Sequence, residues 1–197
     1  MSRRTQQFCP TTGEINCKCI DKKDKISPLL VDLKATLRKL WSDHAFVDAL
    51  VGKAIIDGSP DLPVLTARVQ INQKDIGDQL KPIIGEVNGN TLTALLLQHT
   101  TLAAEVTKAA VRKDRNLNNK KDLLFKNGDE LAYFLSSLNE ERLPLEHIQA
   151  MIAKHNQYML DMTEARINGD YKREVLLFDA FYNETLAMSD AIFNALL

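Results

Sequence analysis

Apolar residues recur along most of the chain in alternating steps of three and four, which is the spacing of one face of an α-helix. Caps, prolines and glycines mark the ends of six such segments. They predict helices over about residues 27–57, 62–84, 91–112, 128–138, 144–167 and 170–196. No segment alternates with the period of two that a half-buried strand requires, and we identify no internal sequence repeat. The pattern therefore predicts an all-α, antiparallel up-and-down bundle of five to six helices within residues 27–197.

Four of the predicted apolar faces are interrupted near mid-length by one polar residue. The interruptions are His44, Asn72, His99 and His155, each on a different helix. Mid-length positions of antiparallel helices lie at similar depth, so we expect these side chains to form one buried polar layer. Asp75, one turn after Asn72, and Asp179, midway along the last helix, are the acidic residues expected to join it.

Two kinds of site fit such a layer. One is a buried hydrogen-bond network, because polar residues in a helical seam fix register and partner choice at some cost in stability. The other is a metal site for zinc or another divalent transition metal, with His44, His99, His155 and Asp179 as ligands. The chain contains neither Glu-x-x-His nor His-x-x-x-His, so no single helix presents a familiar pair of ligands. The sequence favours the network and leaves the metal site as the alternative.

Composition and charge narrow the classes of function. The chain has 197 residues, of which 45% are hydrophobic and 26% charged, and its formal net charge is -1. This balance argues against a nucleic-acid binder, and the basic residues between 112 and 126 fit a solvated loop. No stretch is apolar enough to cross a membrane, and the N-terminus lacks the apolar segment of a signal peptide. We expect an intracellular protein that is not secreted, located in the host cytoplasm or the virion if it is viral.

Residues 1–26 form a polar N-terminal arm that holds all three cysteines, Cys9, Cys17 and Cys19. Three thiols without a nearby histidine fall short of a four-ligand structural zinc site. The simplest interpretation is an arm with free thiols. Disulfides with a second chain, or a metal shared across a dimer, are the alternatives. We expect a homodimer in which the arm ties the subunits together.

Several segments, taken in order, resemble one known family. They are Leu40–His44, Ala67–Gly77, Pro82–Gly85, Leu92–His99, Asn127–Ala132 and Met151–His155. Together they resemble a family of small helical proteins of bacteria and large DNA viruses, whose members often carry a glycosyltransferase label. The resemblance spans roughly residues 28–195 and implies that the His and Asn positions of the polar layer are family features. The arm resembles an addition expected in a virion protein of a marseillevirus-like giant virus.

The glycosyltransferase label has no support in the residues, because the chain has no Asp-x-Asp motif. No phosphate-binding glycine loop or nucleophile elbow is present either. The sequence therefore predicts a non-enzymatic helical-bundle protein without a cofactor, in a structural or packaging role. Other virion proteins are its expected partners if it is viral. The alternative is a metal-binding protein or a metal-dependent enzyme that uses the histidine cluster.

Overall fold

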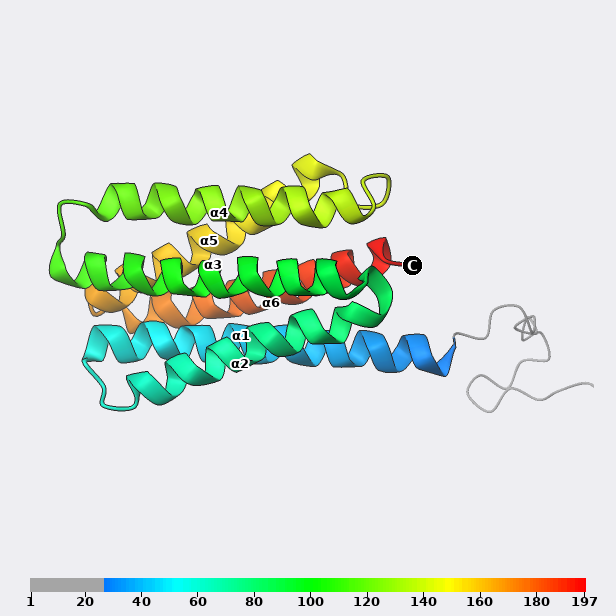
Figure 1. The fold of residues 1–197 in the computed structure, drawn as a ribbon. Helices are drawn as coiled ribbons and strands as arrows, with labels where there is room; N and C mark the ends of the chain where they lie inside the picture. The colour runs from blue at the N-terminus through cyan, green and yellow to red at the C-terminus, as the bar shows by residue number, and fades with distance from the viewer. Residues whose placement is uncertain (1–26) are drawn as a thin grey trace, which may run out of the picture. The chain divides into compact units, whose positions relative to one another are not determined.

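A computed structural model describes residues 27–197, and this part of the chain contains six α-helices and no strand (Figure 1). The helices are α1 (Pro28–Asp57), α2 (Leu62–Ile84), α3 (Glu86–Arg112), α4 (Leu117–Leu138), α5 (Leu145–Ile167) and α6 (Tyr171–Ala195). Consecutive helices run in opposite directions. The all-α bundle predicted from the apolar spacing is confirmed. The N-terminal arm predicted over residues 1–26, with its three cysteines, lies outside the described residues.

Residues Lys34–Leu197 form one compact unit, and every contact given below lies within it. Within residues 27–197, no helix combines the length and apolar character needed to cross a membrane.

Helix α3 begins at Glu86, so the loop predicted over residues 85–90 is wrong. Glycine and asparagine in this segment favour a loop when they are considered alone. Here Gly89 lies in the first turns of α3, where the helix crosses α2 closely: a Cβ on Gly77 of α2 would lie 2.8 Å from the Gly89 carbonyl oxygen. These glycines permit a close helix crossing inside two continuous helices, and only Gly85, with φ of 85°, separates them.

Helix α4 is also longer than its sequence predicts. It spans Leu117–Leu138, so the predicted polar loop over residues 113–121 is half helix. Asn127, which directly precedes the helix predicted over residues 128–138, lies in the middle of α4 and is 1% exposed. An asparagine normally favours a helix end, but this one makes buried contacts that offset its low helix propensity.

The described chain is built of three successive helical hairpins with equivalent turns. The N–H of Ser59, Asp114 and Asp170 each donates to the carbonyl of the alanine five residues earlier, in all three cases at 2.9 Å. Those alanines, Ala54, Ala109 and Ala165, are all buried. A residue with positive φ precedes each donor: Gly58 at 65°, Lys113 at 52° and Gly169 at 74°. This is the Schellman ending of a helix, and it occurs three times at a period of about 55 residues.

The buried positions repeat with the turns. Equivalent sets include Leu37/Leu92/Ile148, Val69/Leu124/Phe181, Ile76/Leu131/Met188 and Leu80/Leu135/Ile192, and every member is buried. The three layer histidines form another such set. The structure therefore repeats where the sequence shows no repeat. The side chains vary from hairpin to hairpin while the burial pattern is kept, and this hides the repeat in the sequence.

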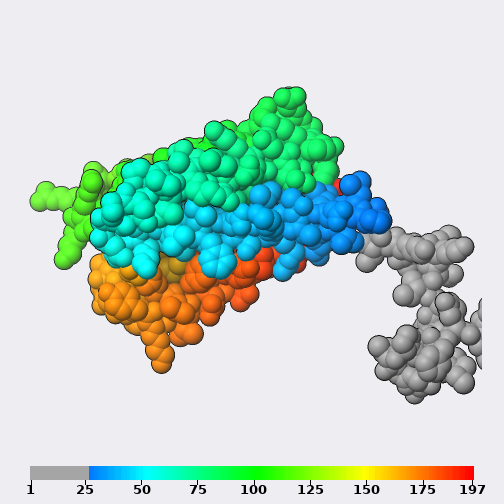
Figure 2. Space-filling model, turned by 90° about the horizontal axis from the view of Figure 1, so that it is seen from below, coloured from blue at the N-terminus to red at the C-terminus, as the bar shows by residue number. Residues whose placement is uncertain are grey.

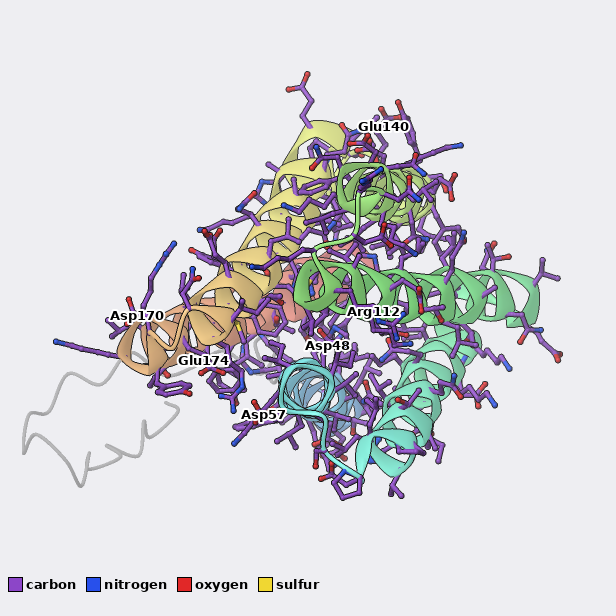
Figure 3. All side chains as sticks on the ribbon, turned by 90° about the vertical axis from the view of Figure 1, so that its left-hand side faces the viewer. Asp48, Asp57, Arg112, Glu140, Asp170 and Glu174 are labelled. Carbon is purple, nitrogen blue, oxygen red and sulfur yellow. The ribbon has the colours of Figure 1, made fainter. Side chains whose placement is uncertain are left out.

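The hairpins enclose a shared core. In the end-on view of Figure 3, the helices surround a centre filled with side chains. Figure 2 shows one face of the bundle, on which α1 runs between α2 and α6. Because α1, α3 and α5 are the first helices of the three hairpins, equivalent residues on them face one another across the core.

Candidate functional site: a histidine layer and an acidic pocket

Three histidine rings lie together in the core of the bundle. His44 of α1, His99 of α3 and His155 of α5 are 3%, 7% and 4% exposed. The ring of His155 stacks on that of His44, with 5.7 Å between centroids and 14° between planes. It lies 6.1 Å from the ring of His99. Asn72 is fully buried. The burial predicted for these four residues is confirmed.

The first hairpin holds His44 through the side-chain amide of Gln73. The two N–H groups of Gln73 Nε2 are shared among three acceptors: the Val69 carbonyl at 3.2 Å, Asn72 Oδ1 at 3.0 Å and His44 Nδ1 at 3.1 Å. Nδ1 of His44 therefore accepts, and the ring proton lies on Nε2. Asn72 Nδ2 donates to the Leu40 carbonyl at 2.9 Å, which ties α2 to α1 a second time.

The second hairpin holds His99 in the opposite tautomer. Asn127 Nδ2 donates to the Leu95 carbonyl and to Gln98 Oε1, both at 3.4 Å, so its Oδ1 is the atom that lies 2.7 Å from His99 Nδ1. Nδ1 of His99 is therefore the donor. Asn127 is equivalent to Asn72, and each donates to the carbonyl four residues before the histidine of its own hairpin.

The third hairpin pairs His155 with a carboxylate. Nδ1 lies 3.2 Å from Glu184 Oε2 and 3.3 Å from Thr185 Oγ1. The Thr185 hydroxyl donates to the Phe181 carbonyl at 2.8 Å, so it accepts from the imidazole, and His155 Nδ1 carries a proton. The side chains of His155 and Glu184 are 5% and 6% exposed. The other carboxylate oxygen, Oε1 of Glu184, is buried and has no partner within the described part of the chain.

Burial controls the protonation of two of these rings. It holds the pKa of His44 well below its usual value, and the neighbouring His155 and His99 lower it further. Burial also lowers the pKa of His99 to about 4; His155 adds to this effect and the bond to Asn127 opposes it. Both rings are therefore neutral near pH 7, in agreement with the tautomers assigned from their hydrogen bonds.

The geometry does not fit the metal site considered from the sequence. Each Nδ1 is already bonded to a side chain of its own hairpin, and stacked rings do not aim their nitrogens at a common point. Zinc needs donors about 2.0–2.1 Å from one centre. Across residues 27–197, no three His, Cys, Asp or Glu side chains are grouped so as to hold a metal ion.

The two acidic residues predicted for the layer are exposed, so that prediction is wrong. The buried stripe of α6 runs through Phe181, Glu184 and Met188, and Asp179 lies two residues before Phe181, on the opposite face. Asp75 lies outside the buried stripe of α2, which passes from Asn72 and Gln73 to Ile76. The predicted stripe of α6 is one position out of phase with the buried one, whereas the stripe of α2 is correct and Asp75 lies beside it.

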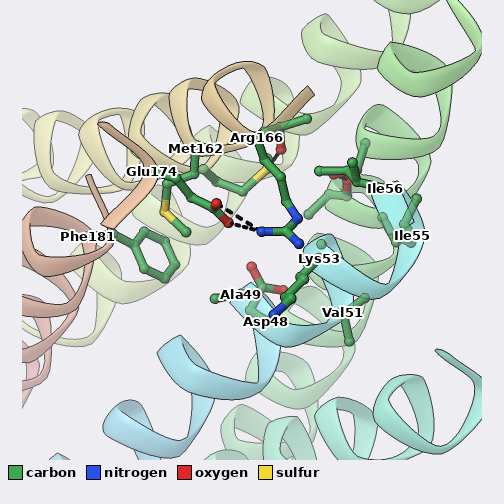
Figure 4. A pocket seen from close by; sticks show the side chains of 16 residues that line it. Asp48, Ala49, Val51, Lys53, Ile55, Ile56, Met162, Arg166, Glu174 and Phe181 are labelled. Carbon is green, nitrogen blue, oxygen red and sulfur yellow. Dashed lines mark hydrogen bonds and ion pairs between the residues drawn. The ribbon is translucent and has the colours of Figure 1, made fainter. Parts of the chain in front are cut away.

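A small pocket adjoins the histidine layer, one helical turn after His44. Asp48 lines it together with Phe181, whose ring lies 4.5 Å from that of His155 (Figure 4). The cavity measures about 30 Å³, enough for one or two water molecules. Burial raises the pKa of Asp48 to about 6, against the opposing effect of nearby His155. No hydrogen bond or ion pair to Asp48 forms among residues 27–197.

One arginine, Arg166, links three helices beside the Asp48 pocket. Arg166 of α5 donates from Nη1 to both oxygens of Glu174, at 3.0 and 2.9 Å, and from Nε and Nη2 to Asp57. The bond to Arg166 lowers the pKa of Asp57, and the bond to Asp57 raises that of Arg166. Glu174 and Arg166 line the same pocket as Asp48, and Asp57 is the last residue of α1. The guanidinium thus joins α1, α5 and α6 and is neutralised by two carboxylates.

Several residues of this site were not predicted from the sequence: Gln73, Asn127 as a buried residue, Glu184 and Asp48. The sequence separation between each histidine and its hydrogen-bond partner is a signal that could have identified these partners. The bonds from His44 to Gln73, His99 to Asn127 and His155 to Glu184 span 29, 28 and 29 residues. The regular spacing of the three histidines identifies the hairpins, and the polar residue at the matching depth of each second helix then follows. Asp48 could have been found as an acidic residue on an otherwise apolar face.

Comparison with known proteins adds no identity to this geometry: no protein-family model, no curated protein and no solved structure matches the chain.

Proposed function

We propose that this protein is a non-enzymatic structural component whose histidine layer keeps three helical hairpins in register. The observation that carries this proposal is the separate pairing of the three imidazoles. Each Nδ1 is bonded to the second helix of its own hairpin, and no ring is left with both nitrogens facing an open cleft. Buried polar pairs of this kind specify which helices pack together and at which register.

A structural role requires a surface for assembly, and α1 and α6 offer one. Phe46 and Leu50 of α1 are 50% and 45% exposed, and Val175 of α6 is 60% exposed. The Phe46 ring lies 5.3 Å from that of Phe178 and 5.4 Å from that of Tyr182, between centroids. These five residues are the aromatic face of the bundle. Contiguous exposed apolar surface marks interaction sites, and we propose that a second copy of the chain covers this face.

The oligomeric state tests the proposal. The full chain should sediment as a dimer, with and without reductant, and Phe46→Glu should convert it to a monomer that keeps its helical circular dichroism. Val64→Glu, at a position 71% exposed on α2 and outside the aromatic face, is the matched control. A chain that is monomeric at every concentration, or a dimer unaffected by Phe46→Glu, would overturn this assembly. A dimer that forms only without reductant would assign the contact to the arm thiols instead.

Elemental analysis tests the non-metal part of the proposal. Protein purified without a histidine tag should carry no stoichiometric transition metal. One metal per chain, lost on His155→Gln, would overturn the hydrogen-bond network as the role of the layer.

A place in a virion is the narrower form of this proposal. It rests only on the resemblance of the quoted segments to the viral family. Mass spectrometry of purified particles of the source virus tests it, since a structural component would be present in many copies per particle. Its absence from the particles would leave a cellular structural role.

A further inference from the structure

The threefold repeat provides an internal standard for each core position. Four residues after the layer histidine, the first hairpin has Asp48, the second Ala103 and the third Met159. All three side chains line the same cavity. In the other two hairpins this position is filled by the methyl group of Ala103 or the thioether of Met159. A carboxyl group is therefore not needed there for packing. Asp48 is an acidic departure from an apolar position.

One turn further along the bundle, the repeat explains the empty space. The equivalent positions are Gly52, Thr107 and Thr163, and they also line the cavity. A Cβ added to Gly52 would meet nothing within 4 Å. The first hairpin therefore lacks the side chain that the other two place there. The same hairpin thus supplies both the carboxyl group and the space in front of it.

Two hydroxyl groups and the Asp48 carboxyl group line this space as acceptors, beside the cations Lys53 and Arg166. The Thr107 hydroxyl donates to the Ala103 carbonyl at 3.1 Å, and that of Thr163 points its proton toward the sulfur of Met159 at 3.9 Å. Their oxygen lone pairs remain available to a ligand, as do the oxygens of Asp48. Arg166, the nearest guanidinium, is neutralised by Asp57 and Glu174. Beside this ion pair and Lys53, the cavity offers the Asp48 carboxylate and two hydroxyl acceptors, and the rest of its lining is apolar.

We propose that the Asp48 cavity binds a primary ammonium group, which pairs with the Asp48 carboxylate and donates to Thr107 and Thr163. An ammonium carries three N–H donors, matching one carboxylate and two hydroxyls. The cavity of about 30 Å³ accommodates the charged end and one carbon, since it has room for about two heavy atoms. The rest of a longer ligand, such as the side chain of a lysine on a partner, would leave through the mouth. This inference is independent of the proposed structural role.

Charged and titratable groups around Asp48 come from three helices. They are Lys53 of α1, His155 and Arg166 of α5, and Glu174 of α6, whereas α3 contributes Ala103, Ala104 and Thr107. Ligand binding requires the ionised carboxylate. Because burial raises the pKa of Asp48 to about 6, affinity should fall as the pH is lowered through that value.

Titration of the full chain with methylammonium chloride tests the proposal, followed by the backbone and carboxyl NMR signals of Asp48 and its neighbours. Sodium chloride at equal concentration controls for ionic strength, and tetramethylammonium controls for charge without N–H donors. A ligand of two heavy atoms should bind with a millimolar dissociation constant. Saturable shifts centred on Asp48, with a lowered titration midpoint of its carboxyl carbon, are expected. Absence of saturable shifts, or equal shifts with tetramethylammonium, overturns the proposal.

Two variants separate the ligand site from the fold. Asp48→Asn should weaken binding about tenfold or more, whereas Asp179→Asn, the same change at an exposed position of α6, should not. Gly52→Ala should abolish binding by filling the cavity while it maintains or raises the unfolding temperature, since alanine favours a helix over glycine. Retained binding in a folded Gly52→Ala variant would place the ligand elsewhere. Butylammonium distinguishes the sources: tighter binding than methylammonium supports a lysine side chain, and weaker binding supports a small free amine.

Discussion

The second and third hairpins hold equivalent histidines by the same nitrogen, but with different partners. His99 donates to the neutral amide of Asn127 at 2.7 Å, and His155 donates to the carboxylate of Glu184 at 3.2 Å. Asn127 places both ends of its amide in hydrogen bonds. Glu184 leaves Oε1 buried without a partner in the described residues. The same backbone position thus accepts a satisfied neutral group in one hairpin and an incompletely satisfied ionisable group in the next.

The difference between Asn127 and Glu184 distinguishes the acceptor that the fold requires from the negative charge that the third hairpin adds. The fold requires an acceptor opposite each donating imidazole, and an amide provides it at little desolvation cost. A buried carboxylate costs more to bury, and its pairing with histidine offsets that cost only while both partners remain. The third hairpin should therefore be the most sensitive of the three to loss of one partner.

The largest effect is expected for Glu184→Ala. This change leaves the His155 Nδ1–H with only the Thr185 hydroxyl and opens a cavity in α6, so the free energy of unfolding should fall by about 3 kcal/mol. Urea unfolding at neutral pH measures it. Asp179→Ala, on the exposed face of the same helix, should cost under about 0.5 kcal/mol. A loss below about 1 kcal/mol for Glu184→Ala would show that the two hairpins are equivalent.

An intermediate effect is expected in acid. Because the folded pKa of His99 is about 4 against 6.5 for a free imidazole, the unfolded chain binds more protons between these values. Its contribution to stability is complete above about pH 6.5 and is lost as the pH falls toward 4. The contribution of Asp48 to the free energy of unfolding changes with pH in the opposite direction. Its pKa is raised from 3.8 to about 6, so this contribution is lost as the pH rises through that window. The two contributions nearly cancel.

Asp48→Asn removes one side of this balance. The variant should lose about 2 kcal/mol more stability than the unchanged protein between about pH 7 and 4.5, because the histidine contribution is no longer offset. His99→Gln should have the reverse effect and flatten the acid loss. Urea midpoints across this pH range check both. Equal acid slopes for the unchanged protein and Asp48→Asn would contradict the assigned protonation states.

The smallest effect is expected for Glu184→Gln, which makes the third hairpin resemble the second. The amide oxygen still accepts from His155 and no charge is buried, so stability should change by less than about 1 kcal/mol at neutral pH. Chemical denaturation measures the difference. A loss as large as that of Glu184→Ala would show that the negative charge itself, rather than an acceptor, is what His155 needs.

Most of the fold was predictable from the apolar spacing, because helices α1, α2, α5 and α6 carry a clear stripe and strong end signals. The starts of α3 and α4 were not. Gly89 is typical of a loop in the sequence, but in the structure it permits the close approach of α3 to Gly77 of α2. At Asn127 an asparagine that reads as a cap is buried among its hydrogen-bond partners. In both cases a tertiary contact decides the local structure, and that contact is invisible in a single segment.

The histidines of the site were predictable and their partners were not. An imidazole on an apolar face is conspicuous, whereas Gln73 and Glu184 lie beside ordinary polar residues and a phase error of one position hides them. Asp179 illustrates the cost of that error in α6, and Asp75 lies beside the correctly predicted stripe of α2; both are exposed. The tautomers depend on three-dimensional bonds alone. The even spacing of His44, His99 and His155 along the chain is the feature of the sequence that corresponds to the three hairpins.

The short span of the histidine bonds has a consequence for how the chain folds. Each bond joins residues 28 or 29 apart and closes within one hairpin. Contacts between rings of different hairpins involve no hydrogen bond. Each hairpin can therefore complete its polar pairing soon after its turn closes, before it meets the others. Docking then brings together hairpins whose imidazole Nδ1 atoms are already paired, and local pairing of this kind favours rapid collapse with few misaligned intermediates.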